Sequence, residues 1–223
     1  MKRILYTLVV GAFALGLQAA QPTTGIKGTM HDLSATGYKT VTNVTEICIF
    51  CHTPHNAASG TAQIIPLWNR TTTGSTFTMY GGATALGTTL KGQSLACLSC
   101  HDGTVAMGSL LNTPYGVTVS YATGTATSQI DKTTGLMVGT HALGTDLSND
   151  HPINVAYDLV GMQPISSLTA NGVELFPTTV VGSTVECASC HDVHNWGGAG
   201  ITGAPFLRVN NTGSALCLTC HNK

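Results

Sequence analysis

The sequence contains few charged residues and few aromatic ones. Asp, Glu, Lys and Arg make up 9% of the 223 residues, aromatic residues make up 6%, and the formal net charge is −1. No cluster of Lys and Arg is present, so nothing indicates a nucleic-acid partner. Large apolar side chains are too sparse to build an ordinary core. Another apolar component must therefore fill the interior.

The sequence has no cysteine to spare for a disulfide. All eight cysteines belong to four copies of the motif Cys-x-x-Cys-His. The copies are Cys48-Ile49-Phe50-Cys51-His52, Cys97-Leu98-Ser99-Cys100-His101, Cys187-Ala188-Ser189-Cys190-His191 and Cys217-Leu218-Thr219-Cys220-His221. Four copies that use every cysteine indicate one shared chemistry more strongly than a single copy would.

The motif is typical of covalent haem c attachment. Two thiols one short turn apart can each form a thioether to a haem vinyl group, and the adjacent histidine then ligates the iron. A zinc site would need paired Cys-x-x-Cys knuckles, without a histidine directly after each second cysteine. The sequence therefore predicts four covalent haems. They would be attached at Cys48, Cys51, Cys97, Cys100, Cys187, Cys190, Cys217 and Cys220, with His52, His101, His191 and His221 as axial ligands.

Four haems would also supply the missing core, because each is a large, flat, apolar body. We predict a mostly irregular fold of coil with short helices and few short strands, wrapped round a stack of four covalent haems. No long stretch shows sustained helical periodicity, so only short helices are expected, directly after the haem motifs. Residues 115–121 alternate polar and apolar side chains, which predicts a short strand.

The supply of histidine allows a second axial ligand for every iron. Nine histidines are present, and the motifs use four of them. Four irons would then be bis-histidine with one histidine left over; methionine is the alternative ligand, but gap-filling packing is the commoner role of methionine. The predicted distal ligands are His31, His55, His151 and His194, and His141 is the spare residue.

Spacing further restricts two of these ligands. His52 and His55 are three residues apart, as are His191 and His194. On a helical turn such side chains lie about 5–6 Å apart, which is too close to straddle one iron. Each Cys-x-x-Cys-His-x-x-His segment is therefore expected to ligate two different haems and hold them side by side.

The chain contains an internal duplication. Each half has a histidine near Asp-Leu-Ser, a Cys-x-x-Cys-His-x-x-His segment, a Pro…Arg segment that ends at Arg70 or Arg208, and a second haem motif. We predict a tetrahaem domain over residues 21–223, built from two tandem dihaem units at about 21–125 and 126–223. In the simplest pairing, His31 and His151 cap the first haem of each unit, and His55 and His194 cap the second. Ligands that cross between units remain an alternative.

The N-terminus resembles a cleaved secretory signal. Lys2 and Arg3 precede an apolar run over residues 4–17, and small residues follow up to Ala20. That run is too short for a membrane span. We expect residues 1–20 to be removed and the protein to be secreted; an uncleaved N-terminal anchor is the alternative.

Several other side chains lie close to the motifs. The carboxylates of Asp32, Asp102, Asp150 and Asp192 could accept an imidazole N–H, or could simply be solvated. Arg70 and Arg208 could pair with haem propionates, or could be ordinary surface arginines. Trp68 and Trp196 are expected to pack on porphyrin edges.

These stretches resemble the multihaem c-type cytochromes secreted by metal-reducing bacteria, and most of all the tetrahaem outer-surface type that polymerises into extracellular nanowires. The matching stretches are His31-Asp32-Leu33-Ser34, Cys51-His52-Thr53-Pro54-His55-Asn56, Cys100-His101-Asp102-Gly103-Thr104, Asp146-Leu147-Ser148-Asn149-Asp150-His151-Pro152 and Cys217-Leu218-Thr219-Cys220-His221. The resemblance implies bis-histidine haems in a continuous chain, with a ligand histidine that can come from a neighbouring subunit. We expect His31 to be the histidine that ligates a haem of a neighbouring subunit, with ligation inside its own chain as the alternative.

The resemblance implies electron transfer without catalysis. The expected form is an extracellular filament on the cell outer surface, with partners that include copies of itself, other cytochromes or an outer-membrane electron conduit, and external acceptors such as metal oxides. One alternative is a soluble periplasmic electron shuttle, although shuttles often dock through charged patches and lysine is scarce in this chain. The other is a multihaem reductase with an open haem.

Overall fold

The computed structural model describes residues 25–35, 37, 41–59, 65–81, 90, 92–121, 129–157, 160–178, 182–195 and 206–222. The predicted signal segment and Trp196 lie outside these ranges.

Within them the chain is mostly coil with short helices and strands, which confirms that part of the predicted fold class. The helices are η1 (Cys48–Phe50), α1 (Gly92–His101), η3 (Pro114–Gly116), η4 (Gly139–His141), α2 (Ile165–Ala170), α3 (Cys187–Cys190), η6 (Thr212–Ser214) and α4 (Ala215–Cys220). The strands are β1 (Thr78–Met79), β2 (Asp146–Leu147), β3 (Val155–Ala156), β4 (Phe176–Thr178) and β5 (Gly182–Val185).

Two local predictions were wrong. The helices overlap the haem motifs and do not begin directly after them: η1 begins at the first cysteine of its motif, and α1, α3 and α4 each contain both cysteines of theirs. Residues 115–121 do not form a strand, because Tyr115 adopts a positive φ of 53° inside the η3 turn. Only Tyr121 makes an isolated bridge, to Val41.

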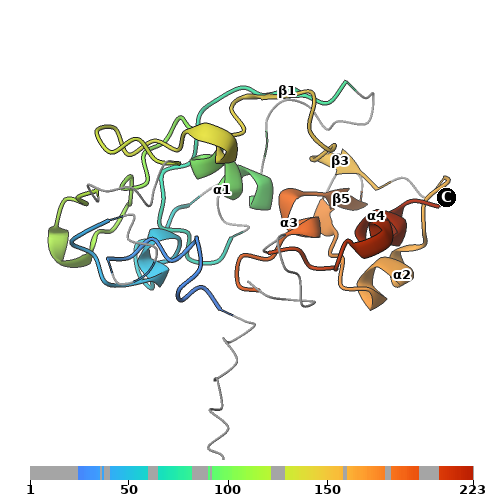
Figure 1. The fold of residues 1–223 in the computed structure, drawn as a ribbon, viewed down its shortest axis with the longest axis horizontal. Helices are drawn as coiled ribbons and strands as arrows, with labels where there is room; N and C mark the ends of the chain where they lie inside the picture. Colours follow the sequence, from blue (N-terminus) through green and yellow to red (C-terminus); the bar gives the residue numbers. More distant parts are fainter. Residues whose placement is uncertain are drawn as a thin grey trace, which may run out of the picture.

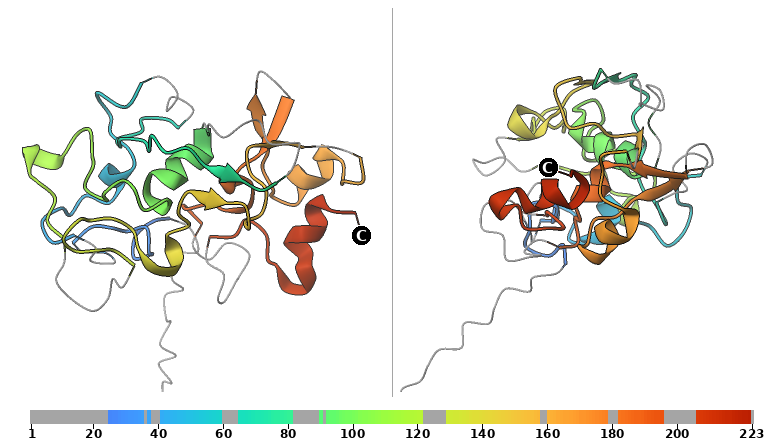
Figure 2. Two further views of the ribbon diagram at one scale, coloured as in Figure 1. Left: turned by 90° about the horizontal axis from the view of Figure 1, so that it is seen from above. Right: turned by 90° about the vertical axis from the view of Figure 1, so that its right-hand side faces the viewer.

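The chain divides its elements between two sides of the molecule (Figure 1). The described residues between 25 and about 150, with α1, lie on one side, and β3, β5, α2 and α4 lie on the other. The two sides are linked by α1 and α3, which approach each other near the middle (Figure 2). Strand β1 pairs in parallel with β2, whereas β5 lies between β3 and β4 in an antiparallel sheet.

Side chains join α1 to α3 at this junction. The Ser94 hydroxyl donates to a carboxylate oxygen of Glu186 and accepts a hydrogen bond of 3.1 Å from the backbone N–H of Cys187. Burial raises the pKa of Glu186. The second motif of the first unit is thereby held against the first motif of the second unit.

Apolar side chains form small separate clusters in the described part of the chain. One packs Phe77, Leu90, Leu95, Leu98 and Leu147. Others surround Phe50, Trp68 and Leu168. This division agrees with the scarcity of large apolar residues in the sequence. No helix in the described ranges is long and apolar enough to cross a membrane.

The duplication is visible in backbone hydrogen bonds of the first unit that recur in the second unit, at residues 139 positions further along the chain. Asn69 N donates to Cys51 O and Thr53 N donates to Leu67 O, each at 2.8 Å. The equivalent bonds, Arg208 N to Cys190 O and Asp192 N to Phe206 O, are also 2.8 Å long. Leu67 and Phe206 share a positive φ, 58° and 67°.

This register corrects the sequence alignment of the arginines. Arg208 is equivalent to Asn69, and Arg70 is one residue further along. The side chains of Asn69 and Arg208 make the same contact: Asn69 Nδ2 donates to Ile49 O and Arg208 Nε donates to Ala188 O, both at 2.7 Å.

Candidate haem-attachment sites

Each haem motif closes on itself as a helical turn. The backbone N–H of the motif histidine donates to the carbonyl of the first cysteine, as in His52 to Cys48 at 2.8 Å and His221 to Cys217 at 2.9 Å. Residues three apart on such a turn face the same side. Both thiols of a motif can therefore reach one edge of the same porphyrin.

The second cysteines of the two motifs in each unit lie near each other. Burial raises the pKa of the Cys51 thiol to about 12, and the nearby Cys100 adds to the shift. In the other unit, burial raises the pKa of Cys190 to about 11, and Cys220 contributes in the same way. The two units therefore share one arrangement of attachment points.

A further thiol contact lies at the junction between the units. The thiols of Cys97 in α1 and Cys187 in α3 are neighbours, and their interaction raises the pKa of Cys97 and lowers that of Cys187. Porphyrins attached at these two residues would meet near their thioether edges.

Three pairs of imidazole rings bring motif histidines together with other histidines. The centroids of His31 and His101 are 6.1 Å apart, those of His52 and His194 are 6.4 Å apart, and those of His151 and His221 are 6.3 Å apart. All nine histidines lie in the described ranges, and among them His55, His141 and His191 belong to no such pair.

These spacings fit one metal ion between two rings. An imidazole nitrogen binds a first-row metal at about 2.0–2.1 Å, so two rings on opposite sides of one metal have centroids about 6.3 Å apart. The described residues contain no group of three or more His, Cys, Asp or Glu side chains arranged to hold a metal ion. A haem iron needs only two protein ligands, since the porphyrin supplies the others.

Backbone carbonyls orient the motif imidazoles. Nδ1 of His52 lies 2.7 Å from Pro66 O, and Nδ1 of His101 lies 2.9 Å from His141 O. A carbonyl only accepts, so Nδ1 carries the proton and Nε2 keeps its lone pair for a metal. His141 supplies its carbonyl here, and its ring is not involved.

Two of the carboxylates that could accept an imidazole N–H, those of Asp32 and Asp102, bind other groups instead. Asp32 accepts hydrogen bonds from Gly28 N and from Ser34. Asp102 accepts from the backbone and hydroxyl of Thr104, each at 2.8 Å. Both carboxylates stabilise backbone turns beside the histidines. Of the four, Asp192 comes closest to an imidazole, with its Oδ1 3.6 Å from Nδ1 of His194.

His31 has the properties of a neutral metal ligand. Burial, helped by the neighbouring His101, lowers the pKa of His31 to about 4. Its Nδ1 is buried and has no hydrogen-bond partner among the described residues. A buried, uncharged imidazole without an ion pair fits ligation of a metal.

The observed pairs differ from the simplest pairing predicted from the sequence. His31 and His151 lie against the second motif histidine of their own units, His101 and His221, and not against the first. His194 lies against His52, across the boundary between the units. The expectation that His31 reaches a neighbouring subunit is not favoured, because its ring already pairs within the chain.

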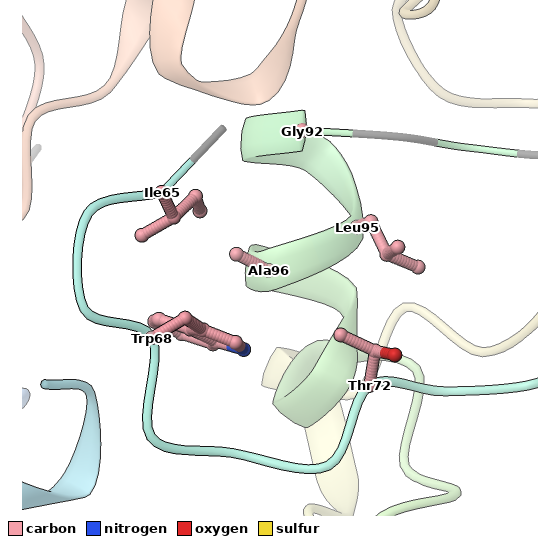
Figure 3. A pocket seen from close by; sticks show the side chains of 6 residues that line it. All are labelled: Ile65, Trp68, Thr72, Gly92, Leu95 and Ala96. Carbon is pink, nitrogen blue, oxygen red and sulfur yellow. The ribbon is translucent and has the colours of Figure 1, made fainter. Parts of the chain in front are cut away.

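Trp68 lies inside the first unit beside the haem motifs. Its ring packs against Ala96 of α1 and lies 6.3 Å from the His52 ring. Figure 3 shows it next to a hollow also lined by Ile65, Thr72, Gly92 and Leu95. Its Nε1 is buried without a hydrogen-bond partner in the described ranges.

An open cavity of about 580 Å³ lies beside α4. It is lined by Gly213, Ser214, Cys217, Leu218 and His221, which include the first cysteine and the histidine of the fourth motif. This volume is in the range of small-molecule and cofactor sites. The fourth motif therefore has room for a haem beside its attachment residues.

Comparison with known protein families supports the same chemistry. Residues 180–223, which hold the third and fourth motifs, match the family described as doubled CXXCH motif. No curated protein matches the chain. The doubled motif indicates covalent binding of haem c by this segment, and a multihaem c-type cytochrome.

Proposed function

We propose that the protein transfers electrons through four bis-histidine c-type haems and turns over no substrate. The observation that carries this proposal is the set of three histidine pairs at 6.1–6.4 Å, each with one motif histidine. A second imidazole on an iron occupies the position that a substrate would need. Such haems exchange electrons without binding small molecules.

The contacts between motifs support a continuous path. Within the units, Cys51 lies near Cys100 and Cys190 lies near Cys220. Between the units, Cys97 touches Cys187, and His194 of the third motif segment faces His52 of the first. Haems attached in this way have neighbours at short range from the first motif to the fourth.

The duplication also supports assembly into a filament. Within the chain, His194 of the second unit faces the motif histidine His52 of the first. The rings of the equivalent residues, His55 and His191, pair with no other ring in the described part of the chain, and His55 is exposed. We infer that His55 of one chain ligates the haem at His191 of the next. The same unit-to-unit contact would then repeat along a homopolymer, with a metal–ligand bond at every junction.

The cellular setting follows from this proposal. The secretory signal expected at residues 1–20 would carry the chain out of the cytoplasm. A filament outside the cell would deliver electrons to other cytochromes, an outer-membrane conduit or metal oxides. A different function would follow if His191 had no partner in any assembly. Its haem would then have an open axial position, as in a multihaem reductase.

The experiment uses the secreted holoprotein. Mass and pyridine haemochrome spectra should give four haems per chain, and electron microscopy should show filaments. Reduced filaments should bind no carbon monoxide. His55→Ala should abolish filaments and give one high-spin haem per chain that binds carbon monoxide.

His141→Ala is the matched control, since its imidazole ring is also unpaired, and it should leave filaments and spectra unchanged. Monomers in which all four haems are low-spin at high protein concentration would contradict the junction. Monomeric wild-type protein that binds one carbon monoxide per chain would support the reductase.

A further inference from the structure

Arg70 is the largest fully buried side chain in the described part of the molecule. Its exposed fraction is 1%, whereas an arginine is normally fully buried only when it is paired. The sequence suggested a surface residue or a partner of haem propionates, and the burial excludes the surface role.

Among the described residues, the guanidinium has neutral partners. Nη1 donates to Met107 O at 2.6 Å and Nη2 donates to Ala106 O at 2.9 Å. In the same part of the chain, Nε has no hydrogen-bond partner, and Arg70 forms no ion pair with a carboxylate. Burying a charge without a counter-charge is unfavourable, which makes this arginine unusual.

Its position is between the two motifs of the first unit. The preceding residue, Asn69, donates its backbone N–H to Cys51 O, and the two carbonyls that bind the guanidinium follow His101 by a few residues. The charge of Arg70 is therefore buried between the attachment segments of both haems.

Arg208 shows the contrasting case in the second unit. Its Nη2 lies 2.8 Å from a Glu174 carboxylate oxygen, and its Nη1 lies 3.9 Å from Asp192. Two carboxylates thus offset this charge near Cys190. In the first unit, the oxygens of Asp102 bind Thr104 instead, and the described residues contain no ion pair between Asp102 and Arg70.

We propose that Arg70 is a fixed buried cation that raises the reduction potentials of the two haems of the first unit. The inference rests on the proposed haem attachment at these motifs. An electron added to a ferric haem removes one positive charge, so a nearby cation favours the reduced form, and low dielectric strengthens the effect. Arg70 is a positioning residue of the electron path, since its guanidinium binds protein carbonyls in the described part of the chain.

The test compares potentials in holoprotein by spectroelectrochemical titration, with each haem assigned from its methyl resonances. Arg70→Met should lower the potentials of the haems at His52 and His101 and leave those at His191 and His221 in place. Arg70→Lys keeps a cation and should retain most of the wild-type values. Arg208→Met is the matched control and should shift the second unit less, because Glu174 and Asp192 already offset that charge.

If Arg70→Met does not fold, Arg70→Gln supplies a neutral side chain whose amide can still donate to one of the two carbonyls. Four low-spin haems with wild-type potentials in either neutral variant would overturn the inference. Equal shifts in all four haems would also overturn it. Missing haems or high-spin spectra in the wild type would contradict the proposed function, and that result is visible before any potential is measured.

Discussion

The segments that follow the first motif of each unit share a backbone and differ in side-chain roles. Both return antiparallel to the motif through equivalent hydrogen bonds, and both place a non-glycine residue at positive φ. In the first unit, the side chains of Trp68, Asn69 and Arg70 in this segment are buried. In the second, Arg208 is 21% exposed and forms ion pairs. The duplicated backbone therefore serves haem attachment, and the side chains are free to differ.

The comparison extends to ligation. Each unit pairs an upstream histidine with its own second motif, His31 with His101 and His151 with His221. The first motifs behave differently: His52 lies against a histidine of the other unit, and the ring of His191 pairs with no other histidine among the described residues. If the proposed junction forms, one rule would describe the whole set: every first motif would take its ligand from the adjoining unit, in the same chain or in the next.

The largest expected effect comes from removing the ligand shared between the units. His194→Ala should leave the haem at His52 with one axial ligand, because no other described imidazole pairs with His52. We expect one high-spin haem per chain that binds carbon monoxide. Unlike His55→Ala, this variant should still form filaments, since the affected haem lies inside the chain. A fully low-spin spectrum in His194→Ala would show that the pair does not ligate iron.

A smaller effect is expected at the equivalent positions Asn69 and Arg208. Asn69 is fully buried, and besides Ile49 O its amide contacts the backbone N–H and carbonyl of Asn112, at 2.9 and 2.8 Å. Asn69→Ala would leave these buried groups unpaired, which should cost about 3 kcal/mol of unfolding free energy. Arg208→Ala removes one equivalent bond and two partly exposed ion pairs, and should cost about 1 kcal/mol.

Urea unfolding of the two holoproteins, followed by circular dichroism, measures the difference. Equal losses of stability would mean that the Asn112 contacts contribute little and that the shared bond to the motif carbonyl dominates.

The motif chemistry and the irregular fold were predictable because they depend on local sequence. Cysteine spacing fixes where a haem attaches, and the lack of periodicity excludes long helices. The pairing of histidines was not predictable, because it depends on how α1 and α3 meet through Ser94, Glu186 and Cys187, residues far apart in the chain.

The register of the duplication was present in the sequence and was missed. Pro66 and Pro205 stand at the same distance from His52 and His191, which aligns Asn69 with Arg208 without a gap. Matching the two arginines instead hid the special position of Arg70. The carbonyl acceptors of the motif imidazoles could not be foreseen, because any backbone carbonyl can take that role and only the tertiary fold selects it.

The smallest expected effect concerns the shared positive φ. Leu67 is 52% exposed, so its side chain contributes little burial, while its left-handed conformation is strained. Leu67→Gly should therefore stabilise the protein by about 0.5 kcal/mol, after the larger chain entropy of unfolded glycine is subtracted.

Phe206→Gly is the matched change at the equivalent site, where the side chain is buried and its ring lies 4.5 Å from that of His31. There the lost packing should exceed the relief of strain and destabilise the fold by about 3 kcal/mol. Denaturation midpoints of the two variants decide the matter: a loss of stability in Leu67→Gly would mean that this exposed leucine is covered by another molecule in the assembled protein.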